Sequence, residues 1–418
     1  MKKTKKQLCI FSPHEDKFDN TNRNLNYSNY LKKHGIDCTL YVSNFNFRTK
    51  KKKKLKNFFY EIDTYNSTRI VRLNTTKFFS NGFDRMLSYI VFFFNSLFYF
   101  FFFEKNKFNL IIGESVPPLI GLSAFFCSLK NKSKFIYQIR DIWPIRLYYS
   151  GLLKKNSLTF IGLEFINKFL INRSIFIISS LPNLKDYLKS KYHYKKEIYH
   201  LPNGSDISTI KKKIKNKKIN FDNNCTRLIY AGGFSPAHEI LNYFKAIENI
   251  QKRYSHYNIF YKFYGDGIEL DKCKSFVRKK RLKNVEFHSS VKKDKIYKIL
   301  LKNNLGICTI SKDKNERFGY NLNKMYDYLV CGLPIIFTND YYKNKFIEKN
   351  KFGFNCNPNY RDISKKIVMF HKLSLKRKAL FSSNAKKYCE KIYDVRNLAA
   401  KLSKILLTEK NEKSKCRS

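Results

Sequence analysis

The chain has 418 residues, 43% of them hydrophobic, and this length predicts two globular domains, because one core rarely serves so long a chain. Lysine and arginine number 83 against 32 acidic residues, which gives a formal net charge of +51. These cations are spread along the chain without a nucleic-acid-binding motif, so no nucleic-acid partner is expected and an anionic membrane surface is favoured. The 10 cysteines form no CxxC pair and no cluster with histidine, so we expect reduced thiols in a cytoplasmic protein.

The first half of the chain alternates short apolar runs with amphipathic ones. This alternation predicts strands that alternate with helices, and therefore an α/β domain with a parallel sheet covered on both faces. A basic run at residues 47–56 is expected to be an exposed loop. The expected strands are residues 7–12, 37–43, 68–73, 108–112, 134–139, 174–179 and 197–201. The expected helices are residues 21–34, 116–129, 157–172 and 182–190.

Residues 86–103 have the most unusual composition, because only Ser88, Asn95 and Ser96 interrupt the apolar side chains. A stretch of this length is nearly long enough to span a bilayer, but it can also form a core helix or a helix in the membrane interface. The strands expected on either side belong to one sheet, which disfavours spanning, and a core helix would normally show a polar face. Lys105 and Lys107, which follow the apolar run in a very basic protein, favour a helix in the membrane interface, and a core helix is the alternative.

The second half repeats the alternation and predicts a second doubly wound domain. Its expected strands are residues 227–231, 258–264, 285–287, 305–310 and 335–337. Its expected helices are residues 239–253, 269–281, 293–302, a short run after Asn323, a run from 363, and one long helix or a pair at 383–407. The domains are therefore predicted at residues 1–209 and 225–382, with a solvated linker at 210–224 and C-terminal helices with a basic tail at 383–418.

Glycine-rich turns follow two strands of the second domain, at Gly232 and Gly233 and at Gly265 and Gly267. Ligands of such sheets bind at the carboxyl ends of the strands, and a turn without Cβ atoms lets backbone N–H groups approach a diphosphate. A glycine after a strand is most often only a turn, so either pair alone is a weak signal. Neither pair belongs to a dinucleotide fingerprint, and we expect no nicotinamide or other cofactor.

A third loop, within residues 317–339, leads into a short predicted helix. Asn323 is expected to cap its N-terminus and Gly332 its C-terminus. Lys324 and Asp327 are three residues apart and share a face of this helix. A helix N-terminus with a lysine suits a phosphate, and a nearby carboxylate suits a sugar hydroxyl. The alternative is a helix that carries one solvated ion pair.

Other chemistries lack their motifs, because the sequence contains no GxxxxGK[ST], no HExxH and no GxSxG. It also contains no Asp-x-Asp pair, which holds a metal ion in many nucleotide-sugar enzymes. We therefore expect no metal site. A donor diphosphate would be neutralised by lysine, arginine, backbone amides and helix N-termini.

Five motifs resemble those of the family 4 glycosyltransferases of the GT-B fold, in which two Rossmann-like domains face a cleft. The similarity is greatest to the bacterial branch that transfers N-acetylated aminosugars such as fucosamine during O-antigen and capsule assembly, and it extends over residues 7–406. The motifs are RDIWP (140–144), LPNGSD (201–206), YAGGF (230–234), YGDG (264–267) and FGYNLNKMYDYLVCGLP (318–334). Of these five, the first and the last are the most specific to the family.

The resemblance implies roles for individual residues. Asp327 occupies the position of the family's second motif glutamate, which binds the donor ribose, and Lys324 lies in the branch's NK pair near the donor phosphates. Arg140 and Asp141 match a His-Asp pair near the transferred sugar and are the expected catalytic residues. The expected donor-binding residues are Gly232, Gly233, Gly265, Gly267, Gly319, Tyr320, Asn323, Lys324 and Asp327.

Two positions depart from the family pattern. The first glutamate of the paired motif would lie at Gly319, and Glu316 is too far upstream to be assumed its substitute. The segment after Phe234 lacks the usual lysine, which removes one expected contact with the donor phosphates.

The resemblance implies a retaining, metal-independent glycosyltransferase that moves a sugar, an N-acetylhexosamine derivative in this branch, from a UDP-sugar to a lipid-linked saccharide. The expected partners are the nucleotide-sugar donor, the lipid-linked acceptor and the anionic inner surface of the cytoplasmic membrane, to which the protein would attach peripherally. Two alternatives are a GT-B epimerase acting on a UDP-sugar and a non-catalytic basic binding protein on a disabled transferase fold.

Overall fold

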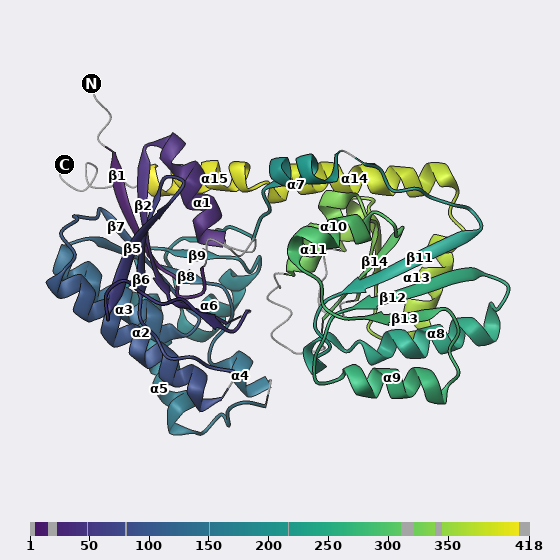
Figure 1. Ribbon diagram of the computed structural model, residues 1–418, viewed down its shortest axis with the longest axis horizontal. Helices are drawn as coiled ribbons and strands as arrows, with labels where there is room; N and C mark the ends of the chain where they lie inside the picture. Colours follow the sequence, from purple (N-terminus) through teal and green to yellow (C-terminus); the bar gives the residue numbers. More distant parts are fainter. Residues whose placement is uncertain are drawn as a thin grey trace. The chain divides into compact units, whose positions relative to one another are not determined.

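The computed structural model describes residues 5–15, 23–47, 49–79, 82–149, 151–215, 217–310, 322–338 and 345–408 (Figure 1). The chain forms two compact units. Unit 1 comprises Met1–Asn203 and Val395–Ser418, and unit 2 comprises Gly204–Asp394. Each unit is a sheet with helices on both faces, parallel throughout in unit 2 and parallel apart from one edge strand in unit 1, as the alternation of strands and helices largely predicts.

The main sheet of unit 1 has eight strands, and a separate pair, β3 (Phe45–Asn46) and β4 (Lys51–Lys52), forms a small antiparallel ribbon. The eight strands are β1 (Lys6–Phe11), β2 (Ile36–Ser43), β5 (Tyr60–Tyr65), β6 (Thr68–Leu73), β7 (Leu110–Glu114), β8 (Lys134–Ile139), β9 (Ile177–Ser179) and β10 (Ile198–His200). Their order is β10-β9-β8-β7-β1-β2-β6-β5, and all pairs are parallel except β5 with β6. The strand order reverses between β1 and β7, which makes this the switch point of unit 1.

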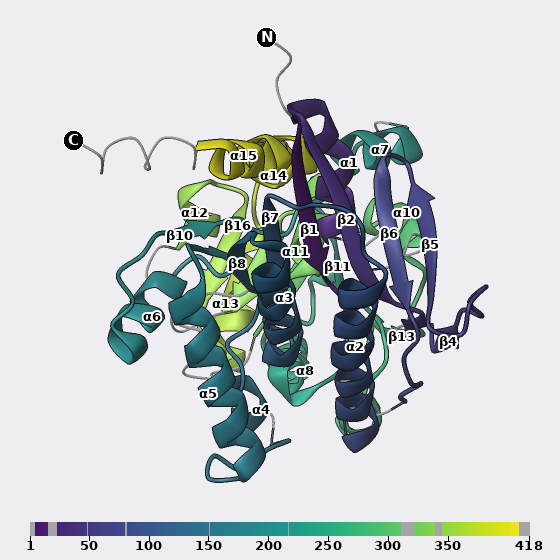
Figure 2. The ribbon, with the colours of Figure 1, turned by 90° about the vertical axis from the view of Figure 1, so that its left-hand side faces the viewer.

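The helices of unit 1 are α1 (Arg23–Leu31) with the 3-10 turn η1 (Lys32–His34), α2 (Phe83–Phe102), α3 (Pro118–Asn131), α4 (Ile145–Tyr149), α5 (Leu158–Arg173), α6 (Leu184–Tyr192) and α15 (Val395–Thr408). Alternate residues of β1 point to opposite faces of the sheet. Leu8 and Ile10 pack in one core with residues of α1 and α15. Phe11 faces the other way and contacts Phe100 of α2, with ring centroids 6.3 Å apart. The helices α2 and α3 therefore cover the face opposite α1 and α15 (Figure 2).

The sheet of unit 2 has six strands, all parallel. They are β11 (Cys225–Ala231), β12 (Asn258–Tyr264), β13 (Val285–His288), β14 (Leu305–Thr309), β15 (Ile335–Thr338) and β16 (Gly353–Cys356). The helical segments are α7 (Ile207–Ile214), η2 (Pro236–His238), α8 (Leu241–Arg253), α9 (Leu270–Lys279), α10 (Lys293–Leu300), α11 (Asn323–Cys331), α12 (Phe346–Lys349), α13 (Tyr360–His371) and α14 (Leu375–Tyr393). The strand order β13-β12-β11-β14-β15-β16 places the switch point between β11 and β14.

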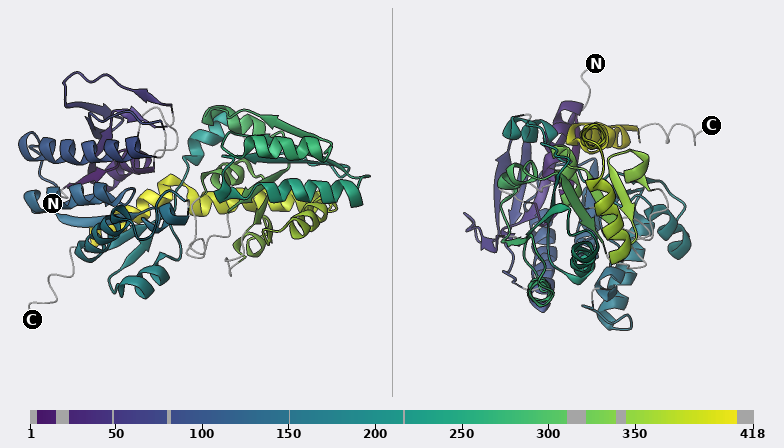
Figure 3. Two further views of the ribbon diagram at one scale, coloured as in Figure 1. Left: turned by 90° about the horizontal axis from the view of Figure 1, so that it is seen from below. Right: turned by 90° about the vertical axis from the view of Figure 1, so that its right-hand side faces the viewer.

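The domain boundaries differ from the prediction. The units divide after Asn203, and the predicted linker begins inside α7, which buries Ile207, Ile210 and Ile214 at helical spacing. The isoleucines make this lysine-rich run amphipathic, so it folds onto unit 2 instead of staying solvated. The predicted C-terminal pair also divides, because α14 belongs to unit 2 and α15 to unit 1 (Figure 3, yellow).

Candidate active site

Buried polar side chains gather at the carboxyl edge of the unit 1 sheet, beside its switch point. Glu114 is the last residue of β7, Arg140 follows β8 directly, and Glu15 follows β1 after a short turn. Ligands of doubly wound sheets bind outside such a switch point. These three side chains are therefore candidates for binding a substrate in unit 1.

An ion pair joins two of them. Nη1 of Arg140 donates to Oε1 of Glu114 over 2.9 Å, and the Asn24 amide donates to the same oxygen over 2.7 Å. The Glu114 side chain is 1% exposed and that of Arg140 is 24% exposed. No residue in the described part of the chain hydrogen-bonds the second Glu114 oxygen, Oε2. The pair fixes the Arg140 guanidinium at the sheet edge and leaves part of its surface open to a ligand.

Glu15 holds the start of α1 in place. Its carboxylate oxygens accept the backbone N–H groups of Asn24 and Leu25 at 3.1 and 3.3 Å. Burial, together with the nearby charge of Glu114, raises the pKa of Glu15 to about 7. This carboxyl therefore titrates near neutral pH at the switch point.

The side chains of the two residues predicted to be catalytic, Arg140 and Asp141, have different surroundings in the structure. Arg140 belongs to the buried cluster, but the Asp141 side chain is 44% exposed and has Nε of Arg146 at 4.0 Å. The sequence analysis missed Glu15 and Glu114. Their positions gave a signal, because each carboxylate lies at the carboxyl end of an apolar strand, where ligands of parallel sheets bind.

A pocket of about 370 Å³ lies at the carboxyl edge of the unit 2 sheet. The turns after β11 and β12, the segment after β13, and the helices α10 and α11 line it. The pocket brings together five of the predicted donor-binding residues: Gly232, Gly233, Gly265, Lys324 and Asp327. These residues come from three separate stretches of sequence, which supports the prediction that they form one site.

Lys324 reaches from the first turn of α11 to the turn after β11. Its Nζ lies 3.1 Å from the Tyr230 hydroxyl and 4.3 Å from the centroid of the Tyr230 ring. A Cβ on Gly232 would lie 2.6 Å from this Nζ, so the missing side chain is what lets the ammonium approach. Within the described residues, no carboxylate forms an ion pair with Lys324, and burial lowers its pKa to about 8. A partly buried ammonium without a counter-ion is suited to bind an anion.

Asp327 forms a different ion pair from the one considered in the sequence. Its Oδ2 accepts from Nζ of Lys293 at 2.6 Å, and its Oδ1 accepts from the Tyr297 hydroxyl at 3.2 Å. Asp327 is 7% exposed, and burial raises its pKa while Lys293 opposes the change. The alternative of a solvated pair with Lys324 is wrong, because α10 supplies another cation and covers the carboxylate. Loss of the Asp327 carboxylate should therefore lower stability, since Lys293 and Tyr297 would lose their acceptor.

Most backbone N–H groups of the glycines in these two turns already donate hydrogen bonds within the protein. The amides of Gly232, Gly265 and Gly267 donate within the turns and to the neighbouring strand, at 2.9, 3.1 and 2.7 Å. These three amides therefore already have acceptors in the free protein, and their contact with the diphosphate stays a prediction. Gly265 is required by packing, because its φ is +146° and a Cβ there would collide with the Gly232 carbonyl. Gly233 lines the pocket without a comparable contact, and its amide is the candidate for a phosphate.

The ends of α11 confirm one predicted cap and correct the other. Gly332 ends the helix with φ of +74°, as predicted. Asn323 is the first helical residue, and Leu322 occupies the N-cap, so the predicted Asn323 cap is wrong. Gly319 and Tyr320 lie outside the described residues, and their roles stay predictions.

The helix predicted at residues 86–103 is α2, which has one covered side and one open side. Within the part of the chain that the structure describes, it is the one helix that is long and apolar enough to cross a membrane, judged by length and composition, and 33% of its apolar window is buried. The strands before and after it, β6 and β7, lie in one sheet, as predicted. On its open side Phe94, Phe98 and Phe102 are 62%, 41% and 73% exposed. The helix is therefore not enclosed in the core.

The open apolar side continues across α3 and α5. Phe126 and Leu129 of α3 are exposed, as are Leu158, Ile161 and Phe165 of α5. Since α3 packs between α2 and α5, the three helices form one surface, which we call the three-helix layer (Figure 2). Surface helices normally turn polar side chains outward, and a contiguous exposed apolar surface marks an interaction site.

A comparison with known protein families finds a match that lies within unit 2. Residues 211–388 match the family described as glycosyl transferases group 1. The match covers most of unit 2 and less than half of the chain. The matched residues include both glycine turns and all of α11, so the pocket around Lys324 lies inside the segment that is similar to group 1 glycosyl transferases. A comparison with curated proteins finds no match.

The whole chain resembles solved structures at low sequence identity. An E. coli structure described as trehalose-6-phosphate bound with UDP-2-fluoro glucose matches with 10% identity, a TM-score of 0.71, and 96% of this chain and 98% of that chain covered. HepE of Anabaena, in complex with UDP and glucose, matches with 10% identity, a TM-score of 0.60, and coverage of 96% and 98%. WaaG, a glycosyltransferase involved in lipopolysaccharide biosynthesis, matches with 12% identity, a TM-score of 0.61, and coverage of 96% and 99%. The fold is therefore GT-B, and the segment that is similar to group 1 glycosyl transferases lies in its second half.

Proposed function

We propose that the protein is a retaining, metal-independent glycosyltransferase that transfers a sugar from a UDP-sugar to a lipid-linked saccharide. The observation that carries this proposal is Lys324, a partly buried ammonium without a carboxylate partner among the described residues, facing a glycine-walled pocket in the segment that is similar to group 1 glycosyl transferases. The motif resemblance supports an N-acetylhexosamine derivative as the sugar, and O-antigen or capsule synthesis as the context.

The donor would bind in unit 2 through its diphosphate and ribose. A phosphate in the pocket would be bound by the Lys324 ammonium and the Gly233 amide, both charge-assisted when the partner is an anion. Asp327 keeps lone pairs free after accepting from Lys293 and Tyr297, so it can also accept from ribose hydroxyls. The neighbours that hold UDP or a UDP-sugar support uridine as the nucleoside of the donor.

The acceptor and the transferred sugar would contact the polar edge of unit 1. Arg140, fixed by Glu114, offers further guanidinium donors to sugar oxygens, and the exposed Asp141 offers a carboxylate acceptor. Glu15 and Glu114 act as positioning residues here, because the first holds α1 and the second holds Arg140. The proposal thus assigns Arg140 and Asp141 to the sugar and acceptor.

We further propose that the three-helix layer attaches the protein to the inner face of the cytoplasmic membrane. Its aromatic side chains would enter the interface, and neighbouring cations would bind anionic headgroups. Lys130 lies over the Phe101 ring at 5.1 Å, so a cation and an apolar group already meet at one end of the layer. Since α2, α3 and α5 each follow a parallel strand, they begin at the carboxyl edge, where Phe83 and Leu158 are 80% and 88% exposed. A saccharide on a membrane-embedded lipid would thereby reach the Arg140 edge.

The donor site is tested by calorimetric titration of UDP. Lys324→Met should weaken UDP by roughly tenfold or more, because it removes a charge-assisted hydrogen bond worth about 1.5–3 kcal/mol. Lys295→Met is the matched control, since Lys295 is an exposed lysine of α10 that does not line the pocket. Equal UDP affinity in the two variants would remove Lys324 from the donor site.

The ribose contact is tested by comparing UDP with inorganic pyrophosphate. Asp327→Asn should weaken UDP relative to pyrophosphate, because only UDP carries ribose hydroxyls, while Lys293, released from the carboxylate, would attract the phosphates of both ligands. Equal losses for both ligands would show that the substitution acts through the fold of the pocket. A panel of UDP-sugars with a polyprenyl diphosphate-linked saccharide then tests transfer, and NMR of the product tests retention of the anomeric configuration.

Membrane attachment is tested by co-sedimentation with phosphatidylglycerol vesicles at high salt, which screens the general attraction of a chain with a net charge of +51. Replacing Phe94, Phe98 and Phe102 with serine should abolish sedimentation, and Ile268→Ser, at a residue of unit 2 that is 85% exposed, should not. UDP affinity should stay unchanged in the triple variant. Sedimentation that survives the three substitutions would contradict the membrane role of the layer.

A further inference from the structure

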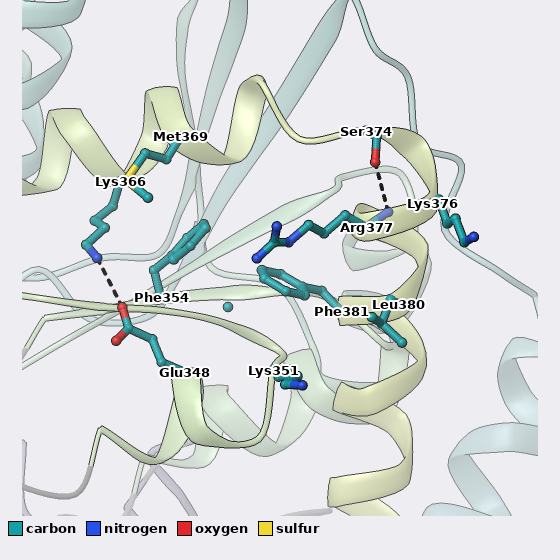
Figure 4. Close-up of a pocket in the computed structure, with 11 residues that line it drawn as sticks. Glu348, Lys351, Phe354, Lys366, Met369, Ser374, Lys376, Arg377, Leu380 and Phe381 are labelled. Carbon is teal, nitrogen blue, oxygen red and sulfur yellow. Dashed lines mark hydrogen bonds and ion pairs between the residues drawn. The ribbon is translucent and has the colours of Figure 1, made fainter.

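A second hollow, of about 610 Å³, lies in unit 2 (Figure 4). Gly353 and Phe354, the first residues of β16, form part of its wall. The donor pocket is formed by residues that follow the carboxyl ends of the strands, so the two sites are at opposite edges of one sheet. The hollow lies within the size range of small-molecule sites, roughly 300–1,000 Å³.

The floor of this hollow is apolar. The rings of Phe354 and Phe381 meet edge to face with centroids 5.6 Å apart, and both side chains are buried. Met369 of α13 and Leu380 of α14 extend the floor and are 39% and 49% exposed. Apolar surface that stays open inside a concavity favours a ligand with an apolar body.

The rim of the hollow is cationic. Lysine and arginine side chains outnumber the single carboxylate by four to one. That carboxylate, Glu348, already accepts from Nζ of Lys366 at 3.0 Å, which leaves the other cations uncompensated by the lining. The remaining cations are Lys351, Lys376 and Arg377.

Arg377 is the best placed of these cations. In Figure 4 its side chain extends into the hollow beside the Phe381 ring. Its backbone N–H bonds Ser374 at the start of α14, and within the described residues no hydrogen bond or ion pair of its guanidinium is found. The N-terminus of the 19-residue α14 adds partial positive charge on the same side.

We infer that this hollow is a second binding site, for an amphipathic anion with one phosphate or carboxylate head on an apolar body. The head binds the Arg377 guanidinium and the rim lysines, and the body lies on Phe354, Phe381 and the exposed faces of Met369 and Leu380. An inorganic anion would leave the floor uncovered, and a neutral amphiphile would leave the guanidinium without an acceptor. The two halves of the lining therefore select for both properties in one molecule.

The test is calorimetric titration of the full chain with decyl phosphate below its micellar concentration. Because the three-helix layer also exposes apolar surface, the site is identified by variants instead of by binding alone. Arg377→Ala should weaken decyl phosphate by roughly tenfold, and Met369→Glu should weaken it similarly by placing a carboxylate over the floor. Lys387→Ala, an exposed lysine on the same helix α14 that does not line the hollow, should change the affinity less than twofold.

Two further ligands separate the contributions of head and body. Inorganic phosphate and decyl maltoside should each bind at least tenfold more weakly than decyl phosphate. Equal affinity for either one, or equal affinity of the Arg377→Ala and Lys387→Ala proteins for decyl phosphate, would overturn the inference. UDP affinity should be the same in all these variants, so a failure here is distinguishable from a failure of the donor site.

Discussion

Arg140 in unit 1 and Lys324 in unit 2 occupy comparable places in two similar sheets, yet their surroundings differ. Each is a partly buried cation at the carboxyl edge. Arg140 has a Glu114 oxygen at 2.9 Å, whereas Lys324 has only the Tyr230 hydroxyl and ring. Removing a cation that is paired in this way leaves a buried carboxylate without a counter-ion, whereas a buried cation that has no counter-ion itself destabilises the folded state until an anion binds. This difference is why we propose that unit 2 binds the anionic part of the donor and unit 1 binds neutral sugar groups.

Removing Arg140 should give the largest effect. Arg140→Met leaves the Glu114 carboxylate buried without a counter-ion, and breaking such a pair costs about 3–5 kcal/mol, here at the low end because Arg140 is partly exposed. Trp143, the single tryptophan of the chain, is buried in unit 1, so urea unfolding of this unit can be followed by its fluorescence. The double variant Arg140→Met/Glu114→Gln should recover most of the loss. Equal stability of single and double variants would mean that the pair is not coupled.

Glu15 should make unit 1 less stable as the pH rises. Its pKa is raised from 4.5 to about 7 in the folded protein, so between these values the folded state holds a proton that the unfolded state has lost. Stability should fall across this window by on the order of 1–3 kcal/mol, and the loss should be complete above pH about 7. Urea unfolding at pH 4.5 and 7.5, read by Trp143 fluorescence, should show a smaller decrease in Glu15→Gln than in the wild type. The same decrease in both proteins would assign the pH dependence to other groups.

The fold was largely predictable because its signals are local. Strands such as Thr68–Leu73 and Lys134–Ile139 match the prediction to the residue, since an apolar run bounded by polar residues marks a buried parallel strand. The antiparallel edge strand β5 was missed, because only one of its residues, Glu61, is buried and its sequence lacks the apolar run. The boundary at Asn203 was missed because the lysines of α7 suggested a solvated linker, although three isoleucines of this helix are buried.

The site was predictable only in part, because its partners come from distant elements. Spacing on α11 suggested Lys324 and Asp327, and both line the donor pocket. Spacing could not show that Lys293 of α10 would bond Asp327, or that Tyr230 of β11 would lie under Lys324. Such contacts depend on how the helices pack on the sheet, which no local pattern encodes.

The third prediction concerns the pH dependence of UDP binding. Burial lowers the pKa of Lys324 from 10.5 to about 8 in the free protein, and a bound diphosphate should raise it again. UDP affinity should therefore fall as the pH rises from 7 to 9, while Lys324→Met should bind weakly and without this decline. The same substitution should raise the stability of the free protein by about 1 kcal/mol, the opposite sign to Arg140→Met, because it removes an uncompensated cation. An unchanged pH profile would contradict this role for Lys324.

The smallest effect is expected from removing divalent metal. Among the described residues, no group of three or more His, Cys, Asp or Glu side chains could hold a metal ion, and the cations that line the donor pocket are Lys293 and Lys324. Lys293 is already bonded to Asp327, so Lys324 is the cation available to the diphosphate. UDP affinity measured with excess EDTA and with added Mg²⁺ should therefore agree within twofold in the wild type. The Lys324→Met variant sharpens this test. If a metal ion neutralised the diphosphate, this variant would still bind UDP when Mg²⁺ is present. Strict dependence of wild-type binding on Mg²⁺ would mean that a metal ion, and not Lys324, neutralises the donor.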